Sequence, residues 1–366
     1  MKIPLSNINL SPLDAQYVID ALGRGWLSGT GDYIPRVEAA LCERIDRAHC
    51  IVTANGTLAL ELALRGLGIG PGDEVLVPAL TFAAPAAAVC NVGATPVFVD
   101  VHPVSWTIDP DLIAERMSHR TRAVIAVDIL GHPADYDAIR AAVGADVKII
   151  QDAAEAHGAR YKGELTGKQG DVSIFSFHAN KAISCGEGGC VLTDDADLAK
   201  RMRVIANHGM TAQYWHDVVG SNTRMGNLYA AVLLGQVERW DELISRRNEV
   251  AGWYDEYFDA ANRRPMADWA EASCWLYVLQ LREPRVFAYL TFKAAGIDAR
   301  QLWRPLPEMP PYRDGREYPV AADVSSRVIL LPTWIGLELS DIELIAGGMF
   351  NRWGEDQVGR KWVIGG

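Results

Sequence analysis

The most reactive side chain that the sequence offers is Lys181, which stands between the apolar run 173–177 and the glycine-rich loop 186–189. An ordinary solvated surface lysine is not expected there, because the position lies between an apolar strand and a tight turn. A desolvated lysine amine can attack an aldehyde and form an imine. Alone, Lys181 could still be an ordinary surface lysine; beside Asp152 and Ser176, a reactive amine is the favoured interpretation.

Asp152 ends the apolar run 149–152, at the carboxyl end of an expected parallel strand, where open sheets bind their ligands. A carboxylate at the edge of an apolar layer favours a cationic partner. A protonated pyridine nitrogen would supply one, and the ion pair would make the ring an electron sink. The alternative is an aspartate that only caps the next helix.

The turn Asn55-Gly56-Thr57 ends another expected strand and opens a helix over residues 58–66. Free backbone N–H groups and a hydroxyl at a helix N-terminus stabilise an anion. An ordinary capped helix has the same sequence, so this turn predicts a phosphate site only together with Lys181 and Asp152.

The sequence lacks the motifs that several other classes of enzyme require. Residues 163–168 are one residue short of a P-loop, and Gln169 follows where serine or threonine is required. No G-x-G-x-x-G lies between a strand and a helix, and the eight histidines have no metal-binding spacing. Nucleotide-triphosphate, dinucleotide and metal enzymes are therefore disfavoured.

The candidate residues must be positioned by a sheet. Between residues 50 and 195, short β-rich runs alternate with helical stretches, which is typical of an α/β fold with a mostly parallel sheet. Ser11-Pro12 predicts a capped helix start. The expected strands are 50–54, 74–79, 95–101, 121–130, 147–151, 171–177 and 189–193.

The pattern changes near residue 236, where residues 236–260 predict one long charged amphipathic helix. Such a helix would connect a large domain, residues 1–240, to a smaller C-terminal α+β domain, residues 241–366. The proline-rich stretch 304–312 is flanked by apolar residues, so we expect a structured loop rather than disorder.

Composition limits the partners of the protein. The 366 residues carry a formal net charge of -11 and are 49% hydrophobic, which predicts a globular protein and disfavours nucleic acid or an anionic membrane as partner. The six cysteines form no C-x-x-C pair and the start resembles no export signal, so we expect a cytoplasmic protein with reduced thiols.

The most apolar stretch, 82–99, is broken by two prolines and a glycine, so no membrane span is expected.

Besides the candidate site residues, the sequence contains three longer motifs: residues 66–75 (GLGIGPGDEV), 93–98 (GATPVF) and 186–189 (GEGG). Together with Asp152, Lys181 and the run 78–82 (PALTF), they resemble the DegT/DnrJ/EryC1/StrS sugar aminotransferases over nearly the whole chain. The resemblance implies a pyridoxal 5′-phosphate (PLP) enzyme of fold type I, with the aspartate-aminotransferase fold.

The resemblance also implies roles for residues around the cofactor ring. Lys181 would anchor PLP covalently, and Asp152 would pair with the pyridinium nitrogen. Phe82 would stack on the ring. Glu155 stands where the family has glutamine or glutamate near the phenolic oxygen of the cofactor.

By the same resemblance, the cofactor phosphate would be held by Gly56, Thr57 and Ser176. Asn222 would reach that phosphate from the partner subunit, which implies a homodimer with shared active sites. The substrates would be a nucleotide-linked keto sugar and an amino donor, by default glutamate.

Three segments, 213–217 (QYWHD), 275–277 (WLY) and 309–312 (MPPY), resemble the GDP-perosamine synthases of this family, which aminate C4 of GDP-linked 4-keto-6-deoxymannose. Thr223 replaces a common tyrosine, and Pro307 stands where relatives usually have a histidine that helps bind the sugar nucleotide. A dTDP- or UDP-linked sugar, aminated at C3 or C4, is therefore the alternative. Within the second of these segments, core packing is the favoured interpretation for Trp275 and Tyr277.

Two other activities are compatible with this fold. A sugar 3-dehydratase of the same family has histidine in place of the anchoring lysine, and Lys181 argues against it. A regulator without turnover would be expected to lack Lys181 or Asp152, or to carry a DNA-binding module.

Overall fold

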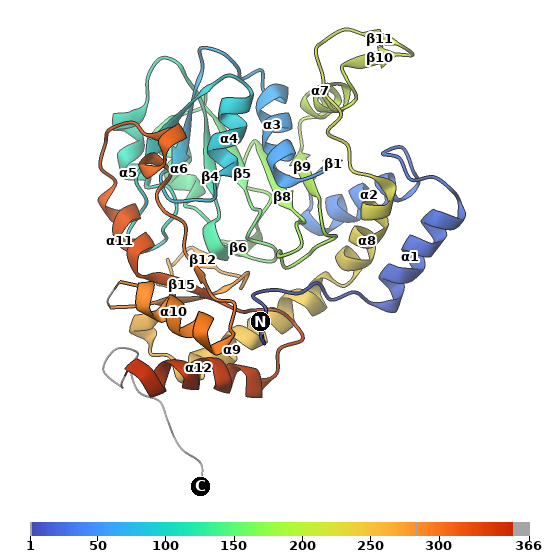
Figure 1. Ribbon diagram of the computed structural model, residues 1–366. Coiled ribbons are helices and arrows are strands. Elements are labelled where there is room, and N and C mark those ends of the chain that lie inside the picture. The colour runs from blue at the N-terminus through green and yellow to red at the C-terminus, as the bar shows by residue number, and fades with distance from the viewer. Residues whose placement is uncertain (1, 283, 354–366) are drawn as a thin grey trace.

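A seven-stranded sheet forms the centre of the computed structural model, which describes residues 2–282 and 284–353 (Figure 1). The strands lie in the order β1-β9-β8-β5-β4-β2-β3. All seven strands expected from the sequence are present, with small differences at their ends. They are β1 (His49–Thr53), β2 (Glu74–Pro78), β3 (Thr95–Val99), β4 (Thr121–Val127), β5 (Lys148–Asp152), β8 (Val172–Ser176) and β9 (Gly189–Thr193).

The largest difference is at β4, which ends at Val127 rather than at residue 130. Asp128 leaves the extended conformation because its carboxylate accepts hydrogen bonds from the Ala134 N–H, the Tyr136 hydroxyl and the Gln151 amide. These bonds fold the chain into a 3₁₀ turn, η2 (Ile129–Gly131).

The direction of the strands brings the candidate residues to one edge. Neighbouring strands from β3 to β8 pair in parallel, and β9 pairs antiparallel with both β8 and β1. Strand β1 therefore points the same way as β8 and β5. The ends of these three strands place Asn55, Ser176 and Asp152 at the same edge of the sheet, as parallel sheets require.

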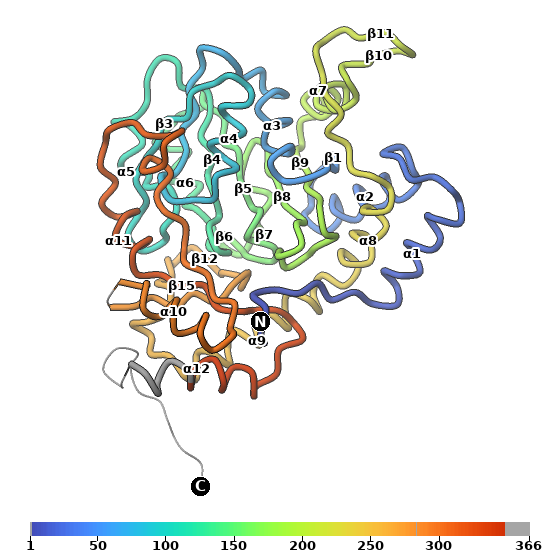
Figure 2. Tube along the Cα trace, in the orientation of Figure 1, coloured from blue at the N-terminus to red at the C-terminus, as the bar shows by residue number. Residues whose placement is uncertain are grey.

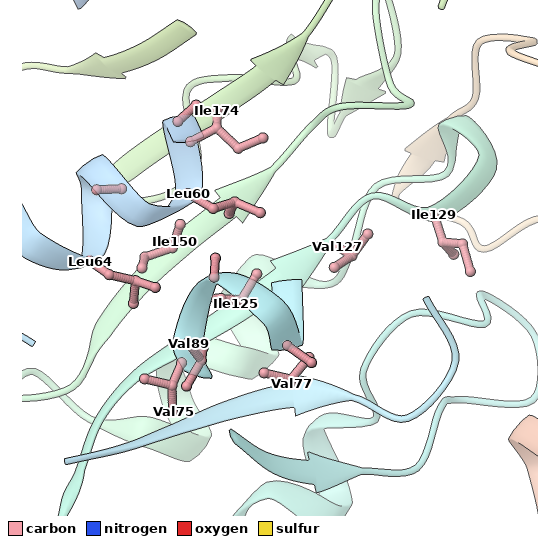
Figure 3. Packing of buried hydrophobic residues seen from close by; sticks show 14 of the residues in the cluster. Leu60, Leu64, Val75, Val77, Val89, Ile125, Val127, Ile129, Ile150 and Ile174 are labelled. Atoms are coloured by element: carbon pink, nitrogen blue, oxygen red, sulfur yellow. The ribbon is translucent and has the colours of Figure 1, made fainter. Parts of the chain in front are cut away.

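Both faces of the sheet are buried, so its strands are continuously apolar. Val75 and Val77 of β2 pack in one cluster with α3 and α4, whereas Leu76 between them packs on the opposite face. Figure 3 shows Leu60 and Leu64 of α3 on the same side of the sheet as Ile150 and Ile125, with which they share a cluster. Fully burying each such side chain contributes about 1.5–3 kcal/mol, which anchors the N-terminus of α3 beside the sheet edge.

Helices cover the sheet on both sides (Figure 1). One cluster joins the sheet to α3, α4 and α7; on the other face, α2 and α8 pack near β1 and α6 packs near β4. Ser11 caps α1 through a capping box with Asp14, as the sequence predicts. The helices up to this point are α1 (Pro12–Gly23), α2 (Tyr33–Ile45), α3 (Gly56–Gly66), α4 (Ala84–Asn91), α5 (Pro110–Ile113), α6 (Tyr136–Val143), α7 (Ala196–Ala206) and α8 (Asn227–Glu238).

The predicted single helix over residues 236–260 is wrong at both ends. The backbone turns at Arg239, with φ −102° and ψ 16°, and its N–H donates to the Gln236 and Val237 carbonyls. This break lets Trp240, which begins α9 (Trp240–Tyr257), turn its buried indole onto Phe175. The domain boundary placed at residue 240 coincides with the start of α9 and stays a prediction.

A second layer follows α9. The sheet β13-β15-β14 is antiparallel and shares a core with α9, α10 and α12. Ile3 packs into this core and bridges to Ile297, so the N-terminal segment lies against the C-terminal elements (Figure 2). These elements are α10 (Val286–Ala295), α11 (Pro319–Arg327), α12 (Leu339–Trp353), β13 (Tyr277–Gln280), β14 (Arg300–Gln301) and β15 (Val328–Leu331).

Two smaller units complete the fold. A three-stranded sheet consists of β12 (Ala270–Glu271), β6 (Arg160–Tyr161) and β7 (Glu164–Leu165). The hairpin of β10 (Met210–Ala212) and β11 (Trp215–His216) projects away from the molecule near α7 (Figures 1 and 2). Within the described ranges, no helix combines the length and the apolar character that crossing a membrane requires.

Candidate active site

A cavity of about 690 Å³ opens at the carboxyl edge of the large sheet. Of the eight residues that the sequence singles out, seven line it: Gly56, Thr57, Phe82, Asp152, Glu155, Ser176 and Lys181. They come from the N-terminus of α3, the loop after β2, the end of β5 with the loop after it, and the end of β8 with the loop after it. The fold thus brings together residues that are spread over much of the chain.

Lys181 is held by a short hairpin-like loop that leaves β8. Phe177 N–H donates to the Gly188 carbonyl and Ala179 N–H to the Gly186 carbonyl, both at 2.8 Å. Gly186 has φ +94°, a conformation that side chains rarely adopt, which explains the glycine-rich sequence after the lysine. The Lys181 side chain is only 10% exposed, so it is a cavity residue and not a solvated surface charge.

Asp152 is a buried carboxylate without a cation against it among the described residues. Its Oδ1 accepts the Ala154 N–H at 3.1 Å, and burial raises the pKa of this carboxyl to about 7. Nearby Glu155 raises the pKa of Asp152 further, whereas Lys181 lowers it. A cation in the cavity beside Asp152 would favour its charged form.

Glu155 lies between the sheet edge and the lysine. The Leu130 N–H donates to its Oε2 at 2.8 Å, and Lys181 Nζ lies 3.5 Å from its Oε1. Burial raises the pKa of Glu155, and the lysine opposes that shift. The carboxylate is therefore fixed at one oxygen and turned toward the amine with the other.

The N-terminus of α3 lies against the end of β8. Asn55 caps the helix by accepting the Leu58 N–H at 2.9 Å. A side chain on Gly56 would place its Cβ 2.9 Å from the Ser176 Cβ, closer than real contacts allow. Glycine is thus required for the helix N-terminus, Thr57 and the Ser176 hydroxyl to meet at the cavity, a donor set suited to an anion.

The sequence analysis missed part of the cavity wall. Trp275 and Trp303 line it beside Phe82, with the two indoles stacked at a centroid distance of 6.2 Å and Phe82 6.1 Å from Trp303. Packing had been the favoured interpretation for Trp275, which is buried and also faces the cavity. No local pattern marks these tryptophans. Tyr277 does pack in the core, stacked on Tyr254 at 4.5 Å.

Asn222 lies outside the cavity of its own chain. It is exposed, bridges to Asn207, and accepts a hydrogen bond from Arg224 Nε at 3.1 Å. The neighbouring Thr223 is buried, and its carbonyl accepts the Ala54 N–H at 2.8 Å, directly before the Asn55 turn. A residue in this loop can therefore contribute to a site only in another copy of the chain or after movement.

Three arginines flank the unusual Pro307, and the structure distinguishes them. Arg300 pairs with Asp298 at 3.0 Å, and Arg313 donates to the Glu308 carbonyl at 3.3 Å. Arg304 is exposed, follows the cavity residue Trp303, and has no ion pair among those found in the described residues. Of the three arginines, only Arg304 directly follows a residue that lines the cavity, and it is not itself among the lining residues.

The cavity suits the expected cofactor. Lys181 supplies a primary amine for an aldehyde, Asp152 a carboxylate for a ring cation, and the α3 N-terminus with Ser176 a set of donors for a phosphate. Phe82 supplies an aromatic face that is half exposed to the cavity side. In the described ranges, no cluster of histidine, cysteine and acidic side chains could hold a metal ion.

Comparison with known proteins gives the same result. The model of the DegT/DnrJ/EryC1/StrS aminotransferase family matches residues 10–350. The chain is 36% identical to GDP-perosamine synthase of Caulobacter vibrioides over 95% of its length and 97% of the relative. It is 34% identical to UDP-2-acetamido-2-deoxy-3-oxo-D-glucuronate aminotransferase of Pseudomonas aeruginosa, over 88% and 91%.

Among solved structures, the PLP form of Spr1654 from Streptococcus pneumoniae superimposes with a TM-score of 0.88 at 28% identity, over 94% of this chain and 97% of the other. The fold is therefore that of the fold-type I PLP enzymes, and PLP is the cofactor. The chain belongs to the DegT/DnrJ/EryC1/StrS family and is a PLP-dependent sugar aminotransferase.

Proposed function

We propose that the protein transfers the amino group of glutamate to C4 of a GDP-linked 4-keto-6-deoxyhexose, with GDP-4-keto-6-deoxymannose as the substrate. The observation that carries the aminotransferase chemistry is the convergence of Lys181, Asp152 and the α3 N-terminus in one cavity. PLP held by these residues would supply the carrier for the amino group and a ring that acts as an electron sink.

Lys181 is proposed to anchor the cofactor aldehyde and, when released from it, to carry a proton between the donor carbon and the cofactor carbon. Its amine lies in the cavity and is nearly buried, so bulk water competes weakly for that proton. Glu155, 3.5 Å away, is proposed to orient the amine and to contact the phenolic oxygen.

Asp152 is proposed to hold the ring nitrogen protonated. Its carboxyl is buried and has no cation against it in the described part of the chain, so a pyridinium placed there would favour the charged form that burial disfavours. Phe82 is proposed to stack on the ring, since its face is available at the cavity wall.

Gly56, Thr57 and Ser176 are proposed to bind the cofactor phosphate at the N-terminus of α3. Asn222 is proposed to complete this phosphate site in a second copy of the chain. Its position outside its own cavity supports a homodimer with shared sites.

The substrate assignment rests on similarity to GDP-perosamine synthase over nearly the full length of both chains. Pro307 is buried and cannot donate a hydrogen bond, so a diphosphate would need another cation. Arg304 next to Trp303 is proposed to replace the histidine that relatives usually have there.

The decisive experiment incubates the enzyme with glutamate and a panel of GDP-, UDP- and dTDP-linked 3-keto and 4-keto sugars, with amino-sugar formation followed by mass. Preference for the GDP-linked 4-keto sugar is expected. Preference for a UDP- or dTDP-linked sugar would contradict the substrate assignment and leave the aminotransferase activity intact. A UDP-linked 3-keto sugar is the second candidate, because the Pseudomonas relative is nearly as similar.

A further inference from the structure

Trp275 contacts the reactive lysine more closely than any other aromatic side chain in the described ranges. Lys181 Nζ lies 4.0 Å from the centroid of the indole ring, over its face. The ring is almost completely buried. A cation over the face of a desolvated tryptophan is stabilised by the negative electrostatic potential of the ring.

The indole is fixed on its other sides. Its Nε1–H donates to the carbonyl of Asn180, the residue before the lysine, at 2.7 Å. Trp303 stacks against it with an interplanar angle of 18°. The ring therefore cannot follow the lysine if the lysine moves, and it offers one defined place for the ammonium.

A buried arginine holds the backbone of both residues. Arg247 of α9 donates to the Trp275 carbonyl at 2.8 Å and to the Lys181 carbonyl at 3.2 Å, and it also reaches the Thr333 carbonyl at 2.7 Å. The contact between lysine and tryptophan is thus supported by elements on both sides of the cavity. Simple core packing explains the burial of Trp275 but not the lysine nitrogen over its ring.

We propose that Trp275 is the resting place of the Lys181 ammonium whenever the lysine is not attached to the cofactor. This inference rests on the proposed role of Lys181 as the anchor. Trp275 is then a positioning residue that favours the released lysine and so aids its release from the cofactor.

The attachment of Lys181 to the cofactor determines in which direction a weaker contact with Trp275 shifts the equilibrium. To attach, the ammonium gives up a proton, and Nζ forms a C=N bond with the aldehyde carbon as water leaves. The cation over the indole is lost in this step. Once the amino donor has displaced it, Nζ would be a free amine again, would take up the proton that the donor ammonium gives up, and would return to the ring. Weakening the π face should therefore favour the attached form.

A ring-fluorinated tryptophan, introduced only at position 275, tests this without changing the size of the side chain or its N–H. The affinity of the cofactor-free protein for PLP should rise roughly 5- to 30-fold, the range of a largely desolvated cation–π contact. The affinity for pyridoxamine phosphate, which has no aldehyde and leaves Lys181 free, should stay the same. The ratio of the two affinities is the measured quantity.

The same substitution at Trp253 is the matched control, because Trp253 carries Arg246 over its ring at 4.6 Å and is absent from the cavity lining. The ratio should not change there. Glu155 also contacts the amine, but fluorination of Trp275 leaves Glu155 intact, so an effect on the ratio is assigned to the ring.

Two ordinary variants add to the test. In Trp275→Leu the ratio should rise as far as in the fluorinated protein, and in Trp275→Phe, which keeps a weaker π face, it should rise less. An unchanged ratio in the fluorinated protein, or equal changes in both affinities, would overturn the inference even if Trp275→Leu does not fold. If the wild-type protein gave no lysine-dependent visible absorption with PLP, the role of Lys181 itself would be wrong.

Discussion

Glu155 and Lys181 form a nearly buried pair, with Oε1 and Nζ 3.5 Å apart and side chains 6% and 10% exposed. The Leu130 N–H fixes the other carboxylate oxygen, so Glu155 is oriented before any ligand binds. The Lys181 ammonium compensates the charge of Glu155 in the cavity. It leaves Asp152 without a cation of its own, which is why burial dominates the pKa of Asp152.

Lys181→Ala should lower turnover by roughly 10³-fold or more, because the variant loses the residue that we propose as both covalent anchor and proton carrier. The visible absorption of the lysine-bound cofactor should also disappear. Steady-state kinetics and a spectrum of the PLP-loaded protein check both effects. Lys168→Ala is a suitable control, since Lys168 forms only exposed ion pairs with Asp46 and Glu164. Turnover near the wild-type value in Lys181→Ala, without added amine, would refute the assignment.

Asp152→Asn should still bind PLP but lose turnover by roughly 10²-fold or more, because an amide cannot hold the ring nitrogen protonated. The loss should appear in kcat rather than in cofactor occupancy. Occupancy is measured from the absorption spectrum and kcat at saturating substrates. Normal kinetics in a fully loaded variant would exclude the proposed ion pair.

Asp152 should also make the stability of the cofactor-free protein depend on pH. Its pKa is raised from 3.8 to about 7, so between these values the folded state binds more protons than the unfolded state. Wild-type stability should therefore fall as pH rises through this window. Asp152→Asn cannot titrate, and its stability relative to wild type should grow by roughly 2–4 kcal/mol from pH 4 to pH 8. Urea unfolding at several pH values measures this; a constant difference would contradict it.

Mixing Lys181→Ala with Asn222→Ala should restore activity if the sites are shared. After subunits exchange, about half of the dimers are hybrids, and each hybrid has one intact site of two, so about a quarter of the wild-type activity should return. Each variant alone stays inactive. No recovery in a mixture shown to contain hybrids would mean that both residues act within one subunit.

Arg304→Ala should raise KM for the nucleotide sugar by roughly 10- to 150-fold, equivalent to one charge-assisted hydrogen bond of about 1.5–3 kcal/mol. KM for glutamate should change little. Arg300→Ala is the matched control, because Arg300 is engaged by Asp298. Equal effects of the two substitutions, or none at Arg304, would remove Arg304 from the diphosphate site.

The strands, the start of α1 and most of the candidate site could be predicted because they depend on local features of the sequence. The seven strands follow from continuous apolar runs bounded by turn residues, and the start of α1 follows from the Ser11 cap and Pro12. Seven of the eight candidate residues line one cavity because each stands at a strand end, at a helix start or in the loop that follows a strand, and parallel strands gather such ends at one edge. The break between α8 and α9 was not predictable, since Arg239 carries no helix-stopping signal and the buried position of Trp240 is a tertiary contact.

The sequence by itself determined the fold class, the cofactor chemistry and the residues at the sheet edge, because periodicity, capping residues and motifs are local features of the sequence. Only the tertiary structure decided that Trp275 and Trp303 face the cavity and that Asp298 engages Arg300. These facts depend on which side of a loop faces which distant element. Packing between residues far apart in the chain sets that orientation, and no local pattern encodes it.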